Sequence, residues 1–373
     1  MSDVDLFSPV TISNLELQNR IVMAPMTRNR AGTNGAPNAD MVLYYGARAA
    51  AGLIITEGTQ PSAVGQGYPR TPGIYQSAHI DGWRRVTAAV HEGGAKIFLQ
   101  IMHAGRVSHA LNTSGLTPIA PSAIPVSDAS KIFTDASGPM DFPVPEVMNE
   151  TSIEEVQQDH ERATRSALEA GFDGVELHAT GGYLMAQFMS TNTNRRLDKY
   201  GGSAENRVRL VVETLERMIA VAGSERVGIR VSPGFTHNDL HDKQPLETHR
   251  VLLAHLAHLR LAYLHVMRVP ARFPDVPSFD PVTSLREHFD GPIIATGGFD
   301  RASAERTLRS GAVDLIGFGR PFIANPDLVA RMKHRWPLAE PDPDLFYTPG
   351  PHGYTDYPTF DDKPNKQVLG GTT

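Results

Sequence analysis

The sequence predicts an α/β fold, a (β/α)8 barrel, because eight short apolar runs alternate with longer helix-like stretches along the chain. The runs are apolar throughout, which is typical of parallel strands that are buried on both faces. The expected strands are residues 21–26, 53–57, 96–103, 174–178, 227–233, 263–268, 292–298 and 314–320. The expected helices are residues 77–92, 152–170, 204–221, 245–259, 302–310 and 326–334.

Local signals at the ends of the helices support this alternation. Ser152, followed by Glu155, has the spacing of a capping box, so we expect a helix to begin at Ser152. Gly171 and Gly311 each follow a helix-like stretch, as glycines do where helices end. These signals divide the chain into the strand and helix units that a barrel repeats.

Three segments fall outside the repeat. Residues 6–20 are short, alternating and rich in turn residues, and we expect a hairpin that plugs one end of the core. Residues 104–150 are rich in Pro, Ser and Gly and follow the third strand, so we expect an insertion with short strands that caps the active-site mouth. Residues 341–373 form an irregular tail, whose first half is expected over the mouth and whose last ten residues are expected to be disordered. No linker divides residues 1–373, so a single domain is expected.

Composition narrows the function classes. The chain has 35 Lys and Arg against 41 Asp and Glu, without a basic block, which argues against nucleic-acid or anionic-membrane partners. The lack of cysteine excludes disulfides, thiolate catalysis and cysteine-bound metals, and fits a reducing cytoplasm. The first residues do not resemble a signal peptide, and no apolar run reaches the ~20 residues of a membrane helix. His255 and His258 do not form a defensible metal-ligand pattern, so no metal is expected.

The stretch from residue 174 to residue 207 carries the clearest chemical signal. It begins as a buried strand ending at His178, breaks at Gly181 and Gly182, and places Tyr183 just beyond. In a parallel barrel, the carboxyl ends of the strands hold the active site. Taken alone, each side chain has an ordinary structural explanation, namely a hydrogen bond for the histidine and core packing for the tyrosine.

A second signal lies at the ends of the last two strands. The seventh ends at Gly297 and Gly298, and the eighth at Gly319 and Arg320. Glycines allow backbone N–H groups to approach a phosphate, and an arginine can bind it with two parallel hydrogen bonds. A phosphate site after strands seven and eight recurs in this fold. The alternative is that these glycines only close tight turns.

Several motifs together resemble the Old Yellow Enzyme family of FMN-dependent ene-reductases. The central stretch reads ELH, GYL and QF, and then NRR.D.YGGS.ENR. Four other motifs occur in the family's order, namely APMTR at 24–28, QIMHAGR at 100–106, RVSP at 230–233 and GFGRPFIANPDLV at 317–329. The resemblance extends from about residue 6 to about residue 357.

The resemblance implies FMN as the cofactor and NADPH or NADH as the hydride donor. Thr27 would touch the flavin near O4 and tune its potential, Arg230 would stabilise the reduced ring, and Gln100 would bind its pyrimidine edge. The residues implied in cofactor binding are Pro25, Thr27, Gly58, Gln100, His178, Arg230, Gly297, Gly298, Gly319 and Arg320. From the residues alone, Thr27 could instead cap a turn, and Arg230 could instead pair with a barrel carboxylate such as Glu176.

The resemblance also implies a substrate site for a small activated alkene, such as an enone, a maleimide or a nitroalkene. His178 would donate a hydrogen bond to the activating oxygen, and Tyr183 would protonate the carbon opposite the hydride. The residues implied around the substrate are Tyr68, Met102, His178, Gly181, Tyr183 and Tyr347. One shared pocket for nicotinamide and alkene implies ping-pong kinetics, and we expect a monomer or a homodimer.

Gly181 departs from the family pattern, which has Asn or His three residues after the histidine. Loss of one such donor typically slows a reaction by ~10²–10³-fold. His178 could suffice with help from Thr180 or water, the glycine could admit a bulkier substrate, or the reaction could be a redox-neutral isomerisation or a desaturation. A flavin-binding protein without turnover is the rival from another class. A flavin-free phosphate-binding barrel is disfavoured by the combination of Gln100, Arg230 and Thr27.

Overall fold

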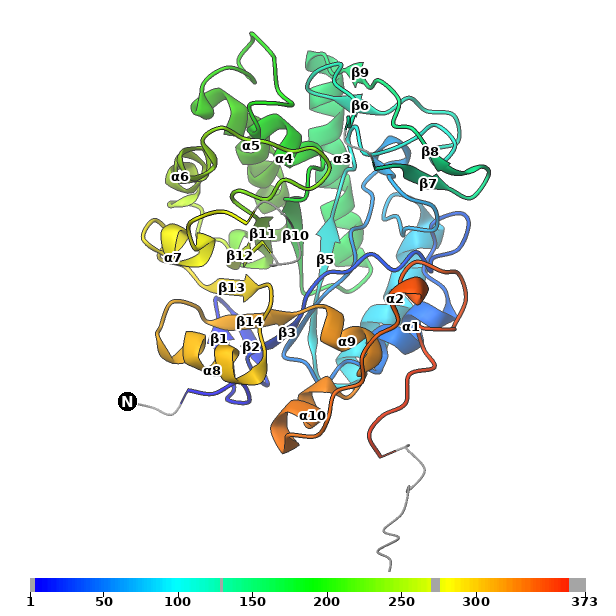
Figure 1. Ribbon diagram of the computed structural model, residues 1–373, viewed down its shortest axis with the longest axis vertical. Helices are drawn as coiled ribbons and strands as arrows, with labels where there is room; N and C mark the ends of the chain where they lie inside the picture. The colour runs from blue at the N-terminus through cyan, green and yellow to red at the C-terminus, as the bar shows by residue number, and fades with distance from the viewer. Residues whose placement is uncertain (1–3, 128–129, 270–275, 362–373) are drawn as a thin grey trace, which may run out of the picture.

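A closed barrel of parallel strands forms the centre of the molecule, as the sequence predicts (Figure 1). The computed structural model describes residues 4–127, 130–269 and 276–361. Neighbours around the barrel follow chain order, and the last strand pairs with the first. The barrel strands are β3 (Ile21–Met23), β4 (Leu53–Ile55), β5 (Lys96–Ile101), β10 (Gly174–Ala179), β11 (Val227–Val231), β12 (Tyr263–Met267), β13 (Ile293–Thr296) and β14 (Leu315–Phe318).

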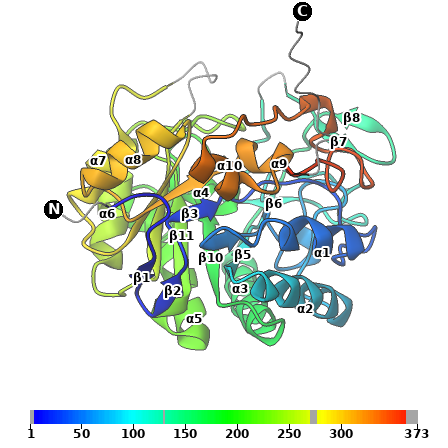
Figure 2. The ribbon, with the colours of Figure 1, turned by 90° about the horizontal axis from the view of Figure 1, so that it is seen from below.

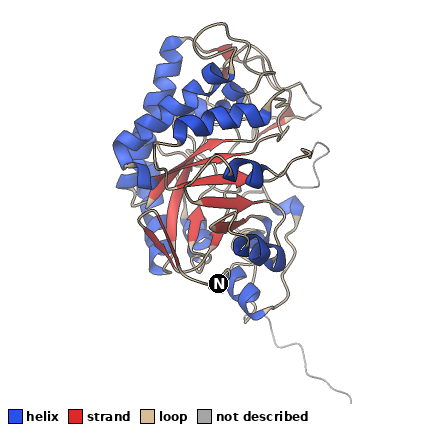
Figure 3. Cartoon of the chain, turned by 90° about the vertical axis from the view of Figure 1, so that its left-hand side faces the viewer, coloured by secondary structure: helices blue, strands red, loops and turns tan. Residues whose placement is uncertain are grey.

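Helices surround the strands, which gather in the interior (Figure 3). All six predicted helices are confirmed, and the one at residues 77–92 has the predicted bounds. Short helices after β3, β10, β12 and β14 were not predicted. The helices are α1 (Ala39–Gly46), α2 (Ser77–Glu92), α3 (Glu150–Glu169), α4 (Leu184–Met189), α5 (Ala204–Ala222), α6 (Pro245–Leu256), α7 (Pro281–Arg286), α8 (Arg301–Arg309), α9 (Arg320–Ala324) and α10 (Leu328–His334).

The predicted capping box at Ser152 is wrong. Helix α3 begins at Glu150, and its N-cap is Asn149, whose side-chain oxygen accepts from the backbone N–H of Ser152 at 2.9 Å. Asparagine is at least as good an N-cap as serine, so the upstream residue takes this position. Gly171 and Gly311 do end their helices, with φ values of +88° and +75°.

The amino-terminal hairpin closes the lower end of the barrel, as predicted. Strands β1 (Val10–Ile12) and β2 (Leu15–Leu17) pair antiparallel and lie against the barrel (Figure 2). Their buried side chains Ile12, Leu15 and Leu17 pack in one cluster with residues from the first half of the barrel strands, including Leu53 and Leu315. The core at this end of the barrel is therefore filled by side chains.

The stretch from 104 to 150 contains short strands, as predicted. Strands β6 (Ile119–Ala120) and β9 (Glu146–Val147) pair parallel, and β7 (Ile132–Thr134) and β8 (Gly138–Met140) pair antiparallel. None of the described helices is long and apolar enough to cross a membrane.

Two arginines after β3 hold the carboxyl-terminal tail against the barrel. Arg28 donates to the main-chain oxygens of Phe346 and Gly353 at 3.0 and 2.8 Å. The Arg30 guanidinium donates to the main-chain oxygens of Leu345, Phe346, Gly350 and His352. These bonds bring the segment at 345–353 to the mouth of the barrel. The last ten residues, expected to be disordered, lie outside the described residues.

Candidate active site

Two adjoining cavities lie at the carboxyl ends of the barrel strands. The larger has a volume of about 740 Å³ and runs along the ends of β13, β14 and β3. The smaller has a volume of about 150 Å³ and lies at the ends of β5, β10 and β11. Pro25, Thr27 and Arg230 line both. The larger volume is in the range of cofactor and ligand sites in proteins.

The structure gathers the residues that the sequence analysis singled out. The smaller cavity is lined by Pro25, Thr27, Gly58, Gln100, Met102, His178, Gly181, Tyr183 and Arg230. The larger cavity is also lined by Gly297, Gly298, Gly319, Arg320 and Tyr347. Tyr68 joins the site through Tyr183, because the two phenol oxygens are 3.2 Å apart. Their individual roles remain predictions.

Strand register places a polar network inside the barrel below the cavities. Glu176 on β10 lies opposite Gln100 on β5, and its carboxylate accepts from the Gln100 amide at 2.7 Å. The second carboxylate oxygen is 2.8 Å from Nδ1 of His265, whose Nε2 is 2.6 Å from the Thr296 hydroxyl. Burial lowers the pKa of His265, so the ring is neutral, donates from Nδ1 and accepts at Nε2.

This network fixes the orientation of Gln100. A carboxylate can only accept hydrogen bonds, so the amide nitrogen of Gln100 must face Glu176. The side-chain oxygen is left to accept a hydrogen bond from a molecule in the cavity that Gln100 lines. Thr296 lines the larger cavity, so the network connects the two cavities through the barrel interior.

Arg230 supplies a buried positive charge at the floor of the site. It is only 8% exposed, and its Nε has no hydrogen-bond partner within the part of the chain that the structure describes. Burial lowers the pKa of Arg230 while Glu176 raises it, and an arginine stays charged under such shifts. Glu176 is bound by Gln100 and His265, and the ion pairs among described residues do not join it to Arg230. The buried cation is therefore available to a negatively charged or carbonyl group in the cavity.

His178 ends β10 as a neutral hydrogen-bond donor. Burial, and then the charge of Arg230, lower the pKa of His178 well below its usual value. Its Nδ1 makes a long contact, 3.5 Å, with the backbone N–H of Thr180. When Nδ1 accepts this contact, the proton is on Nε2, which can donate to a ligand in the cavity. The ring centroid lies 5.0 Å from that of Tyr183, at an interplanar angle of 75°.

Tyr183 keeps its proton at neutral pH. Burial raises the pKa of Tyr183, and the nearby Tyr347 adds to the rise, while Tyr68 and Asn238 oppose it. Burial and Tyr183 raise the pKa of Tyr68 well above its usual value. Two protonated phenols in hydrogen-bond contact can deliver a proton at the mouth of the smaller cavity.

Position 181 lies inside the site. The side chain that this chain lacks there would have been next to Tyr183 and His178. A Cβ atom on Gly181 would be 3.2 Å from the Tyr183 ring and 3.9 Å from Cε1 of His178. The backbone φ of +61° suits glycine and is tolerated by asparagine. The Asn238 amide donates to the Gly181 carbonyl at 2.7 Å and fixes this turn.

Glycine occupies positions 58, 297 and 298 in the lining of the two cavities for different physical reasons. A Cβ on Gly58 would lie 2.6 Å from Sδ of Met102, so this glycine makes room for a methionine. A Cβ on Gly297 would lie 2.7 Å from a main-chain oxygen of Arg268. At Gly298, by contrast, a Cβ would meet nothing within 4 Å, so its backbone faces open space. Arg320 is exposed, and its guanidinium lies 5.8 Å from the Phe346 ring centroid.

Sequence reasoning missed several residues that line the site. Phe235, His237 and Met267 line both cavities, and Asn238 contributes through its bond to Gly181. All follow or end β11 and β12. Their position after strands was available as a signal, but the return of the loop over the site depends on Asn238, whose φ is +58°.

Comparisons with known proteins agree with this geometry. The family model for the NADH:flavin oxidoreductase / NADH oxidase family matches residues 5–339. A probable flavin mononucleotide-dependent alkene reductase of Leishmania infantum is 41% identical, over 95% of this chain and 97% of that protein. The 12-oxophytodienoate reductase 1 of Oryza sativa subsp. japonica is 39% identical, over 96% of this chain and 94% of the relative.

Solved structures of similar proteins share the whole fold. Morphinone reductase superposes with a TM-score of 0.93 at 40% identity, and the match covers 99% of each chain. The old yellow enzyme homologue from Zymomonas mobilis gives a TM-score of 0.91 at 38% identity, over 95% of this chain and 99% of that one. The chain belongs to the NADH:flavin oxidoreductase / NADH oxidase family, and it is an FMN-dependent oxidoreductase of the old yellow enzyme kind.

Proposed function

We propose that this enzyme reduces the activated C=C bond of small enones, maleimides and nitroalkenes with NADPH or NADH. The observation that carries the proposal is the juxtaposition of a neutral histidine donor and a protonated tyrosine, His178 and Tyr183, whose ring centroids are 5.0 Å apart. Both line a cavity that also exposes Gln100 and the buried cation Arg230.

The cavities fit FMN by their donor set. At the phosphate end, Gly298 faces open space, and Gly319 and Arg320 line the same larger cavity. At the ring end, the side-chain oxygen of Gln100 would accept from an N–H group, and the orphaned Arg230 would meet the negative charge of a reduced ring. Pro25, Thr27 and Gly58 line the same cavity and would complete the surroundings of the ring. Bound FMN supplies the hydride, which it takes from NADPH or NADH.

The residues of the chain would hold the alkene and move one proton. His178 donates from Nε2 to the activating oxygen of the substrate and stabilises the negative charge that grows there. The Tyr183 hydroxyl gives its proton to the α-carbon, and Tyr68, 3.2 Å away, holds that hydroxyl in place. Met102 and Tyr347 shape the pocket, and Tyr347 is 59% exposed at the entrance.

Gly181 favours one alternative that keeps the same site. With one side-chain donor absent, a redox-neutral isomerisation or a desaturation would hold the substrate oxygen elsewhere in the cavity. Reduction and isomerisation differ in how much NAD(P)H they consume. Net reduction consumes one NAD(P)H for each product molecule, and isomerisation consumes none.

Nicotinamide and alkene would use the same cavity in turn, so we expect ping-pong kinetics. A cytoplasmic location, a monomeric or homodimeric state, and one domain over residues 1–373 belong to the same proposal. The lack of cysteine fits the cytoplasmic location, and the continuous repeat of strand and helix supports the single domain.

An anaerobic spectrum of the purified protein tests the proposal. Flavin absorbance should bleach when NADPH or NADH is added and return when 2-cyclohexenone is added. Bleaching without return would contradict ene-reduction of a simple enone and point to isomerisation or another substrate. Bound flavin that neither nicotinamide reduces would instead support a non-catalytic flavin-binding protein.

A further inference from the structure

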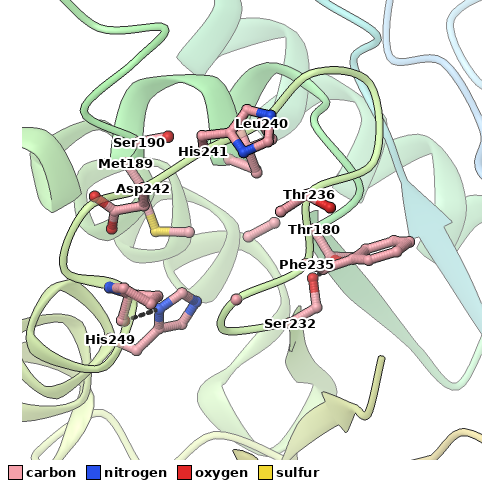
Figure 4. Close-up of a pocket in the computed structure, with 14 residues that line it drawn as sticks. Thr180, Met189, Ser190, Ser232, Phe235, Thr236, Leu240, His241, Asp242 and His249 are labelled. Atoms are coloured by element: carbon pink, nitrogen blue, oxygen red, sulfur yellow. Dashed lines mark hydrogen bonds between the residues drawn. The ribbon is translucent and has the colours of Figure 1, made fainter. Parts of the chain in front are cut away.

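A separate cavity of about 110 Å³ lies beside the active site, between α4 and α6 (Figure 4). The loop at 234–242 covers it. Thr180 and Phe235 line this side cavity and also the smaller active-site cavity, so they form a common wall. The side cavity therefore adjoins the place where His178 and Tyr183 meet the substrate.

Much of the wall of the side cavity is apolar. Apolar lining comes from Ala179, Ala186, Met189, Phe235 and Leu240.

One polar lining side chain, His241, is exposed, and its Nε2 lies 3.6 Å from the Asp239 carboxylate. The buried polar groups, with one exception, are occupied. The hydroxyls of Thr180 and Ser232 bond to each other, and the Ser190 hydroxyl donates to Asn192. Asp242 accepts from the Thr248 hydroxyl at 2.6 Å and lies 3.8 Å from the Arg207 guanidinium.

The exception is His249 on α6. It is only 7% exposed, and in Figure 4 its ring faces the cavity from the side opposite Thr180 and Phe235. Its Nδ1 lies 2.7 Å from the Pro245 main-chain oxygen, which can only accept, so Nδ1 carries the proton. Its Nε2 has no partner within the described residues. Burial lowers the pKa of His249, so Nε2 stays an unprotonated acceptor.

This arrangement selects a particular ligand chemistry. An acceptor at the end of an apolar pocket requires a hydrogen-bond donor on the ligand, and leaving it unmet is unfavourable. A carboxylate brings only acceptors and would lie near Asp242. An ammonium group would lose its hydration without gaining an unpaired carboxylate, because Asp242 is already paired. A neutral hydroxyl satisfies the acceptor without either penalty.

The volume sets the length of the ligand. An apolar cavity of ~150 Å³ holds benzene. The side cavity, about 110 Å³, therefore fits a chain of about three carbons and a hydroxyl. The chain would enter past Phe235, whose ring stacks on His237 with a centroid distance of 5.5 Å.

We propose that the side cavity is an annex of the substrate site, which takes a short hydroxyalkyl substituent of the alkene and in which His249 Nε2 accepts a hydrogen bond from the hydroxyl of that substituent. The proposal rests on the proposed ene-reduction, and it extends that function to a class of substrate. The enzyme would prefer activated alkenes with a terminal alcohol on a short apolar chain.

Matched substrates test the annex directly. The holoenzyme is assayed with 2-cyclohexenone and with derivatives bearing 3-hydroxypropyl, n-butyl or 2-carboxyethyl at ring carbon 4, 5 or 6. At one ring position or more, kcat/KM for the hydroxypropyl compound should exceed that for the butyl compound by roughly three- to tenfold, the worth of one hydrogen bond. The carboxyethyl compound should be the poorest of the three.

Variants of the cavity then assign the preference. His249→Leu removes the acceptor and should bring the hydroxypropyl-to-butyl ratio to about one. His255→Leu, on the same helix but at the surface with Glu205, is the matched control and should keep the wild-type ratio. Ala186→Leu fills the cavity and should lower kcat/KM for both chains relative to 2-cyclohexenone.

Binding without turnover separates failure of the annex from failure of the reaction. The Kd values of the corresponding saturated cyclohexanones, followed by the perturbation of flavin absorbance, should show the same order. A wild-type enzyme that binds hydroxypropyl and butyl ketones equally would overturn the annex, whether or not 2-cyclohexenone is reduced. A preference that survives in His249→Leu would overturn it as well. Tighter hydroxypropyl binding by an enzyme that does not reduce 2-cyclohexenone would support the annex and contradict ene-reduction.

Discussion

The floor and the substrate side of the active site are built in opposite ways. On the floor, Gln100, Glu176, His265 and Thr296 form a chain in which each hydrogen bond is short and each partner is assigned. On the substrate side, one histidine and one tyrosine meet at Gly181, which brings no side chain. The floor is preorganised for a cofactor that is always the same, whereas the substrate side leaves space for ligands that differ.

Removal of the single donor should have the largest effect. His178→Ala leaves the activating oxygen without a side-chain hydrogen bond, so kcat/KM for 2-cyclohexenone should fall by ~10²–10³-fold. Flavin content serves as the control for the integrity of the floor. A loss below tenfold would mean that another group already stabilises the oxygen, and the contrast between the two sides would weaken.

A smaller and opposite effect is expected when the missing side chain is restored. Gly181→Asn places an amide between His178 and Tyr183, at a backbone φ of +61° that asparagine tolerates. One added hydrogen bond to the substrate oxygen should raise kcat/KM for 2-cyclohexenone by roughly three- to tenfold. Gly181→Ala fills the space without a donor and should bring no gain. If alanine and asparagine behave alike, position 181 acts through volume alone.

The floor should respond through the flavin potential. Glu176→Gln removes a buried negative charge, which favours the anionic reduced flavin. For a carboxylate and a reduced ring ~10 Å apart at an effective dielectric of ~20, the repulsion between the two charges is roughly 1.7 kcal/mol. This corresponds to a positive shift of about 35 mV for a two-electron couple. Thr296→Val keeps the charge and should shift the midpoint less. Equal shifts in both variants, measured by anaerobic redox titration, would show that the network acts by geometry instead of charge.

The sequence was sufficient for the fold because its signals are local. Each barrel strand is a continuous apolar run, and burial on both faces enforces that pattern regardless of the rest of the chain. The start of α3 was misplaced because two good N-caps lie close together, and Asn149 rather than Ser152 takes the position. Only the main-chain geometry distinguishes them.

Sequence analysis predicted the site residues that lie on barrel strands or directly after them. His178, Arg230 and Gln100 belong to strands or their ends, so their position in the barrel follows from the fold. Phe235 and His237 depend on a loop that turns back. His249, on α6, faces its cavity only because residues of α4 and of the loop at 234–242 line the same cavity. The need for glycine at position 58 was equally impossible to predict, because it arises from the close approach of the Met102 sulfur atom.

The half-reactions of Tyr183→Phe, followed by anaerobic stopped-flow, test the central claim most directly. The phenol acts on the substrate side alone, so reduction of the flavin by NADPH should stay within about twofold of wild type. Reoxidation by 2-cyclohexenone should slow by ~10²-fold or more, because the proton donor is absent. Equal slowing of both half-reactions, or unchanged reoxidation, would contradict the division between a floor that serves the cofactor and a side that serves the alkene.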